Sequence, residues 1–252
     1  MIYRHYKDFD DLFLNFNKEI ILHPDKLMSY TQNIQGFLED VVIDIDDYKC
    51  TLDLSNFGYT KGKWPHLMRS YIDYPQLVEY KKVLPTLTGM SKTYYFQQHF
   101  KGNGPCLIAI VLTRPKRKGP WKSIKVFYRT CELQKKLSAD LILINRFIKE
   151  LPQECCEIDS ITMHMAQAYV SGMFINGYFE YFNVDRKLIA RSKHPWHKTL
   201  MGNYTRFFKD PSQLNNYKAL QKMQNLHFGL VKLPHLKPSD FSIVGYFESR
   251  KK

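Results

Sequence analysis

Cys106 is the candidate nucleophile of this sequence. It follows Gly104 and Pro105 and opens a short apolar run rich in branched residues, 107–112. The thiolate is the reactive form of a cysteine, and nearby positive charge favours it. Basic residues follow the run in the segment 114–122. The alternative is a buried core thiol, which is the usual state of a free cysteine.

Arg129, Thr130 and Asp140 are the other side chains whose types suit a binding site. A guanidinium group can bind two phosphate oxygens at once, although Arg129 could equally point outward from an alternating strand. Thr130 could add a hydroxyl or simply pack as a residue that favours strands. Asp140 follows Arg129 by eleven residues and flanks the core-like Leu137 and Leu141. Burying a lone carboxylate is costly, so a buried Asp140 would need a ligand partner, whereas a helix-surface Asp140 would not.

The elements that position these residues follow from hydrophobic periodicity. Residues 107–112 and 123–130 are predicted to be strands. The loop 114–122 between them contains Pro and Gly, which predicts a hairpin with a long basic tip. Apolar residues recur at about a 3.6-residue period over 132–151, which predicts a helix that Pro152 ends.

The remaining segments predict a mixture of strands and helices. We expect a helix at 9–16, a helix running into a strand over 34–45, strands at 160–170 and 240–247, a basic loop over 183–211 and a helix over 213–226. Residues 51–100 give only a weak prediction. The strands are more numerous and the helices longer, which favours an α+β fold in one domain, 1–252.

Composition excludes several classes of protein. The chain has 252 residues, of which 44% are hydrophobic and 15% aromatic, and this argues against disorder. No apolar run approaches the ~18 residues of a membrane span, and the acidic N-terminus has no signal-peptide core. We therefore expect a cytoplasmic protein without membrane contact. The five cysteines include no Cys-x-x-Cys pair, which indicates free thiols in a reducing compartment and no zinc site.

Charge is concentrated in the middle of the chain. The net charge is +13, and residues 101–150 alone hold twelve basic and three acidic residues. Such a field attracts phosphates, so the loop 114–125 could bind a nucleic acid backbone. The other reading of the same residues is a solvated basic surface.

Four segments, in order, resemble thymidylate synthase and its relatives, the pyrimidine nucleotide hydroxymethylases. Gly104-Pro105-Cys106 is similar to the family's catalytic Cys after Pro. Tyr-Arg-Thr-Cys-Glu at 128–132 is similar to its Gln-Arg-Ser-x-Asp, and Leu-Ser-Ala-Asp at 137–140 stands where it has Leu-Pro-Phe-Asn. Asp-Phe-Ser-Ile-Val-Gly-Tyr at 240–246 is similar to its C-terminal strand. A weaker match is Ala-Gln-Ala-Tyr at 166–169, against Ala-His-x-Tyr.

This resemblance implies a thymidylate synthase-like mixed sheet packed by helices and a homodimer. It implies that Cys106 adds to C6 of a pyrimidine and so makes C5 nucleophilic. By the same resemblance Arg129 and Thr130 bind the nucleotide phosphate. Tyr169 binds the sugar 3′-hydroxyl, and Gln167 keeps one hydrogen bond of the family's His.

Asp140 is the residue that indicates which pyrimidine base the resemblance implies. The synthases have Asn there, and the cytosine-acting relatives have Asp. A carboxyl group can accept from the N4 amine of cytosine and, when protonated, donate to N3. The implied reaction transfers a one-carbon unit from methylenetetrahydrofolate to C5 of cytidylate, as in phages that modify their DNA. Glu132 stands where an Asp of the family binds the folate pterin.

Some positions depart from the family pattern. Leu107 follows Cys106 where the family usually has His, and Lys136 stands where a Gly lets the folate approach. The nucleotide half of the expected site is kept and the folate half is altered. The sequence therefore leaves a second hypothesis open: a catalytically lapsed relative that binds nucleotide or nucleic acid, or scaffolds an assembly.

Overall fold

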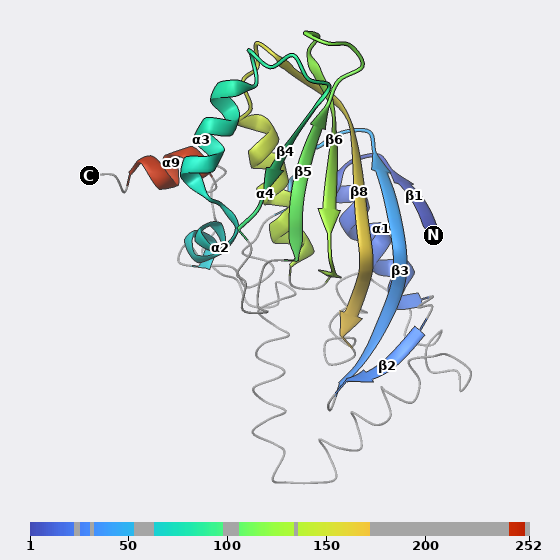
Figure 1. Cartoon of the computed structure of the whole chain (residues 1–252). Coiled ribbons are helices and arrows are strands. Elements are labelled where there is room, and N and C mark those ends of the chain that lie inside the picture. The colour runs from blue at the N-terminus through green and yellow to red at the C-terminus, as the bar shows by residue number, and fades with distance from the viewer. Residues whose placement is uncertain are drawn as a thin grey trace, which may run out of the picture.

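In the computed structural model, the described residues form one mixed sheet of eight strands that is packed by helices (Figure 1). The structure describes residues 1–22, 26–30, 33–52, 63–97, 106–133, 136–171 and 242–249. The mixture of strands and helices confirms the α+β class expected from the sequence. Among the described helices, none is long and apolar enough to cross a membrane.

The N-terminal segment supplies one edge of the sheet and a covering helix. Strand β1 (Ile2–Tyr6) precedes helix α1 (Phe9–Leu22), and strands β2 (Lys26–Tyr30) and β3 (Asn33–Ile45) follow. β1 pairs with β3 in parallel and β2 pairs with it antiparallel. The apolar side chains expected to face the core from the N-terminal helix are all buried: Phe9, Leu12, Phe13 and Phe16.

The expected change from helix to strand within 34–45 is wrong, because β3 is a strand over this whole segment, interrupted only at Asp40 with its positive φ of 52°. Val41, Ile43 and Ile45 are buried, whereas Val42 and Asp44 between them are partly exposed. This alternation has the period of two that a strand with one buried face requires. Pairing with strands on both sides fixes the segment as extended.

The weakly patterned segment after residue 62 contains two helices and a strand. These are α2 (Lys63–Tyr71), α3 (Tyr74–Val83) and β4 (Ser91–Tyr95). Asp73 caps α3, since its side chain accepts a hydrogen bond from the backbone N of Gln76 at 3.1 Å.

The hairpin and the following unit agree with the sequence except at one helix start. Strands β5 (Leu107–Thr113) and β6 (Trp121–Tyr128) are antiparallel neighbours, as predicted. Helix α4 (Leu137–Lys149) begins later than expected, because the short strand β7 (Cys131–Glu132) pairs with β8 (Cys156–Ser171). β8 contains the strand expected over 160–170.

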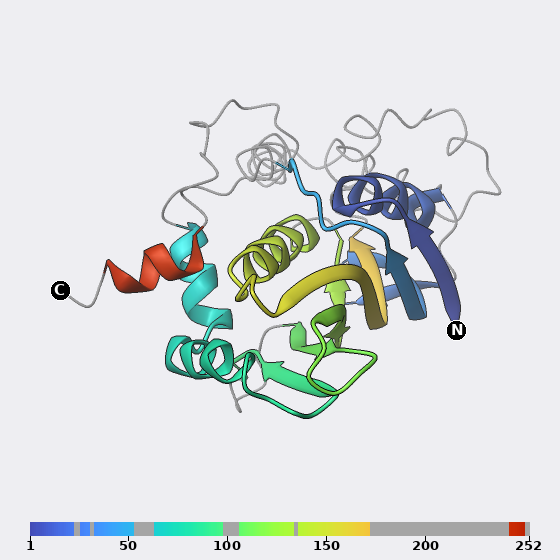
Figure 2. The ribbon, with the colours of Figure 1, turned by 90° about the horizontal axis from the view of Figure 1, so that it is seen from above.

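Helix α4 connects β6 to the parallel strand β8 and is buried nearly all round. The sheet order is β1-β3-β8-β6-β5-β4, so β6 and β8 lie near its centre. α1 and α4 cover the same face of this sheet side by side (Figure 2). Four apolar residues that follow the 3.6-residue period of the segment 132–151 are fully buried: Leu133, Leu137, Leu141 and Ile144.

Arg114 lies beneath the hairpin tip rather than on it. It is only 5% exposed, and its guanidinium group donates to the carbonyl oxygens of Leu87, Gly89 and Gly119. The group also lies 4.2 Å from the ring centroid of Trp121. Arg114 therefore fastens the tip to the preceding turn, and its expected role as a cation free to meet phosphate is wrong.

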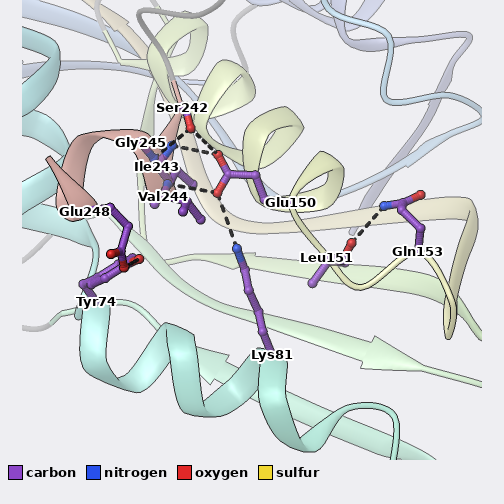
Figure 3. Close-up of polar contacts among 10 residues, drawn as sticks. All are labelled: Tyr74, Lys81, Glu150, Leu151, Gln153, Ser242, Ile243, Val244, Gly245 and Glu248. Atoms are coloured by element: carbon purple, nitrogen blue, oxygen red, sulfur yellow. Dashed lines mark hydrogen bonds and ion pairs between the residues drawn. The ribbon is translucent and has the colours of Figure 1, made fainter.

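The strand expected over 240–247 is wrong, because the structure forms helix α9 (Ile243–Glu248) there. Ser242 caps this helix by accepting from the backbone N of Gly245 at 3.0 Å. The carboxylate of Glu150 accepts from the backbone N of Ile243 at 2.8 Å and of Val244 at 3.2 Å (Figure 3). Two otherwise unsatisfied donors of the first turn thus find an acceptor, which stabilises a helix over a strand.

Contacts with α3 and α4 hold α9 against the body of the molecule. Glu150 follows α4 and also pairs with Lys81 of α3 at 3.4 Å, and both side chains are largely buried (Figure 3). The rings of Tyr74 and Phe247 stack with centroids 4.6 Å apart. The basic loop expected over 183–211 and the helix expected over 213–226 lie outside the described residues.

Candidate functional site

Most of the residues singled out by the sequence lie at one end of the sheet. β6 ends at Tyr128 and β7 at Glu132, which pairs with Tyr169 near the end of the parallel strand β8. β5 runs the opposite way, so its first residue, Leu107, pairs with Tyr128 at this same end. The carboxyl ends of parallel strands are where open sheets place binding side chains.

Cys106 and Thr130 are in direct contact at this end. The Thr130 hydroxyl donates to the Cys106 sulfur at 3.3 Å, and the backbone N of Arg129 donates to the Cys106 carbonyl oxygen at 2.9 Å. The Cys106 side chain is buried, with 7% exposed. A donor aimed at sulfur stabilises negative charge there, which is the charge that a nucleophilic thiol develops.

Asp140 lies in the first turn of α4 and is fully buried. No hydrogen bond of ordinary geometry reaches either carboxyl oxygen from the described residues. Burial raises the pKa of this carboxyl to about 7, although the Lys136 charge and a weaker polar contact with Tyr71 lower it. A buried carboxyl whose described polar contacts are this weak is costly, so the position would gain from a further hydrogen-bonding partner.

Tyr128 links the thiol and the carboxyl. Its hydroxyl is buried and has no hydrogen-bond partner within the described part of the chain. Burial raises its pKa well above the ordinary value, and charges on Asp140 and Cys106 act in the same direction. Both groups therefore lie within electrostatic range of one phenol. Tyr128 was not among the residues expected to bind or react. The signal available in the sequence was a polar aromatic residue at the last inward position of a strand.

Glu132, Cys131 and Tyr169 extend the same cluster. Burial raises the pKa of Tyr169 to about 12, and charges on Glu132 and Cys106 contribute. Burial also raises the pKa of Cys131, and Asp140 and Cys106 are the next causes. We call these residues the thiol–carboxyl cluster: Cys106, Tyr128, Thr130, Cys131, Glu132, Asp140 and Tyr169.

Arg129 and Gln167 are close in sequence to members of this cluster. Arg129 stands between Tyr128 and Thr130 with an exposed side chain, and Gln167 is partly exposed on β8. The residues expected to bind one nucleotide thus lie at the same end of the sheet, and some of them are buried while others are exposed. The buried ones suit a base and the exposed Arg129 suits a phosphate.

The basic hairpin tip lies at the opposite end of the sheet (Figure 1). The seven residues of β5 separate it from Cys106 by about 23 Å at ~3.3 Å per residue. Lys122 pairs with Glu157 at 2.8 Å and Asp159 at 3.6 Å, so acidic side chains partly neutralise this end of the basic loop. Lys116, Arg117 and Lys118 remain exposed. The loop cannot contribute to the thiol–carboxyl cluster.

Two other features of the described residues bear on function. They include no group of three or more side chains placed to hold a metal ion. A shallow hollow between α3 and β4 lies away from the cluster and offers no nucleophile; it is lined by Gln76, Glu79, Tyr80, Val83, Lys92 and Thr93. The cluster is therefore the better candidate for chemistry. Comparison with protein-family models and with curated proteins finds no match to this chain.

Proposed function

We propose that the chain binds a pyrimidine nucleotide at the thiol–carboxyl cluster and transfers a one-carbon unit to C5 of cytidylate. The observation that carries the proposal is the unsatisfied, fully buried carboxyl of Asp140 beside the Cys106–Thr130 pair. A cytosine edge offers the complementary groups. The proposal includes a thymidylate synthase-like fold, a homodimer and a cytoplasmic location.

Asp140 suits cytosine in its protonated form. With a pKa of about 7, a substantial fraction of the carboxyl is neutral near neutral pH. A neutral carboxyl can donate its proton to N3 and accept from the N4 amine. Uracil presents an acceptor at O4 and a donor at N3, so a neutral carboxyl matches uracil only when its proton sits on the oxygen that faces O4. The preference for cytosine therefore requires that the buried site keep the proton on the oxygen that faces N3.

Cys106 would then act on C6 of the bound ring. Its sulfur forms a bond to C6, and the C5=C6 π electrons move into the ring so that C5 becomes enamine-like. After substitution at C5, loss of the C5 proton and departure of the thiolate restore the double bond. The Thr130 hydroxyl stabilises the sulfur whenever it carries negative charge.

Methylenetetrahydrofolate would supply the one-carbon unit at the oxidation level of formaldehyde. Glu132 is the residue of this chain suited to bind the amino group of its pterin. This carboxylate is 8% exposed, and its charge raises the pKa of Tyr169, so it faces the cluster as a hydrogen-bond acceptor.

The second candidate is a catalytically lapsed protein that binds nucleotide or nucleic acid, or scaffolds an assembly. The burial of the cluster favours this second candidate, since Asp140 has no exposed surface and Cys106 has very little. Nucleic acid binding would use the exposed cations Lys116, Arg117 and Lys118 at the other end of the sheet.

Exchange of the C5 hydrogen separates the two candidates without any folate. Addition of Cys106 to C6 labilises the C5 proton, so the chain should release tritium from C5-labelled dCMP into water. Cys106→Ser should abolish release, and Cys50→Ser is the matched control that should keep it. Nucleotide binding without release would support the lapsed binder. A chain that neither binds the nucleotide nor releases tritium would contradict both nucleotide hypotheses.

A further inference from the structure

Cys155 and Cys156 form a second thiol pair, far from Cys106 in the chain. Their sulfurs lie 3.7 Å apart, and both cysteines are free. Successive side chains on a strand point to opposite faces, which normally separates neighbouring thiols. Here Cys156 begins β8, while Cys155 still belongs to the preceding turn. The turn therefore directs both sulfurs to the same side.

Backbone hydrogen bonds fix this turn. The backbone N of Cys155 donates to the Pro152 carbonyl oxygen at 3.2 Å, and its own carbonyl accepts from the backbone N of Trp121 at 2.8 Å. Trp121 also pairs with Cys156 in the sheet. Both cysteines are thus held by Trp121, the first residue of β6, so the convergence of the sulfurs is built into the fold.

The spacing suits a bridging atom better than a disulfide. Neighbouring Cα atoms are about 3.8 Å apart, shorter than the ~4.4–6.8 Å usual for disulfide-bonded cysteines. Two bonds of about 2.3 Å to one bridging atom place the sulfurs roughly 3.3–3.8 Å apart, as the angle at that atom goes from near 90° at a pyramidal trivalent centre to tetrahedral. The observed separation of 3.7 Å lies within this range.

One thiol of the pair is reachable from solvent, whereas Cys156 is only 5% exposed, so a ligand would bind first at Cys155. Cys155 is partly exposed, and Gln153 and Glu154 beside it are exposed. Burial raises the pKa of both thiols, so they stay protonated at neutral pH and react slowly as nucleophiles. A ligand that takes up two thiols with loss of water does not depend on a preformed thiolate.

We propose that Cys155 and Cys156 form a chelating site for monosubstituted trivalent arsenicals. In R–As(OH)₂ two As–O bonds break and two As–S bonds form, and the thiol protons leave with the hydroxyl groups as two water molecules. Arsenic stays trivalent, so no oxidant or reductant is needed. The second As–S bond forms within one molecule, which should raise affinity roughly a hundredfold over a single thiol.

Mass spectrometry of the full-length chain with phenylarsine oxide tests the site. One phenylarsenic group should add per chain, be removed by a dithiol and resist an equal concentration of monothiol. Cys155→Ser and Cys156→Ser should each weaken binding roughly a hundredfold, since each leaves one thiol. Cys50→Ser should bind like the parent chain.

Cys106 and Cys131 offer the competing pair, because their charges interact. If Cys155 and Cys156 form the site, the variants Cys106→Ser and Cys131→Ser should still bind the arsenical. Loss of binding in these two with retention in Cys155→Ser would overturn the proposal, as would a parent chain that takes up no arsenical. The outcome is independent of nucleotide binding.

Discussion

The Thr130 hydroxyl donates a hydrogen bond to the Cys106 sulfur across 3.3 Å. The two residues are 24 positions apart in the chain and meet because the β5–β6 hairpin returns to its starting end. A free cysteine in a core needs no such donor. Cys106 is itself buried, so this donor is the structural feature on which the nucleophile hypothesis depends.

Removing this donor should slow the reactions of Cys106. Thr130→Val keeps the shape of the side chain and deletes the hydroxyl, so negative charge developing on sulfur loses about 0.5–1.5 kcal/mol of stabilisation, or roughly two- to tenfold in rate. Alkylation of Cys106 by iodoacetamide, followed by peptide mass spectrometry, measures the effect. Thr113→Val removes a hydroxyl contact with Ser123 at the other sheet end and should leave the rate unchanged.

Arg129 should contribute to phosphate binding. Arg129→Ala should weaken binding of a pyrimidine nucleotide by roughly 1.5–3 kcal/mol, the range for hydrogen bonds to a charged group. Arg117→Ala removes an equal charge at the hairpin tip and serves as the matched control for the electrostatic field. Equal losses in the two variants, measured by titration calorimetry, would show that Arg129 acts only through net charge.

Asp140 should make stability fall as pH rises. Its pKa is about 7 in the folded chain and ~3.9 when unfolded, so the folded state holds the extra proton between these values. Stability is therefore lost from about pH 4 to pH 7, and below pH 4 the group has no effect. Asp140→Asn removes this loss, and its advantage over the parent chain should grow by on the order of 3–4 kcal/mol between pH 4 and 8.

Urea unfolding at several pH values measures this difference. Asp159→Asn is the control, since Asp159 is an exposed partner of Lys122. A constant difference between Asp140→Asn and the parent chain across the range would mean that Asp140 is ionised in the folded protein.

Glu150 should hold helix α9 in place. Glu150→Ala leaves the backbone N of Ile243 and Val244 without their acceptor and Lys81 without its partner, so about 2–3 kcal/mol of docking energy should be lost. Hydrogen exchange over 243–248 should accelerate while α4 keeps its protection. Glu154→Ala, four residues further along in an exposed turn, should change neither. Unchanged exchange in Glu150→Ala would show that the Tyr74–Phe247 stacking alone holds α9.

Local periodicity predicted the central elements, and tertiary contacts decided the others. The β5–β6 hairpin, α4 and β8 have clear apolar patterns and were found near their expected positions, although α4 begins later and β8 earlier than expected. β7 was missed because two residues carry no period, and its pairing with β8 is a long-range contact. Helix α9 was missed because Glu150, which satisfies its first turn, lies 93 residues away from Ile243.

The candidate site shows the same division. Residue types and the family resemblance singled out Cys106, Thr130, Asp140 and Tyr169, and the structure brings them to one sheet end. Tyr128 could not be given a role from the sequence, since only burial reveals its unsatisfied hydroxyl. Arg114 was misassigned because nothing in a run of basic residues shows that one of them turns inward to three carbonyl groups.

Base preference tests the central claim most directly, because Asp140 carries it. Calorimetric titration of dCMP and dUMP into the parent chain and Asp140→Asn should show a preference for dCMP of roughly ten- to a hundredfold in the parent, since a mismatched buried edge costs about 1–3 kcal/mol. Asp140→Asn should reduce or invert this preference and keep the phosphate contribution. Equal affinity of the parent chain for dCMP and dUMP, or binding of neither, would contradict the account.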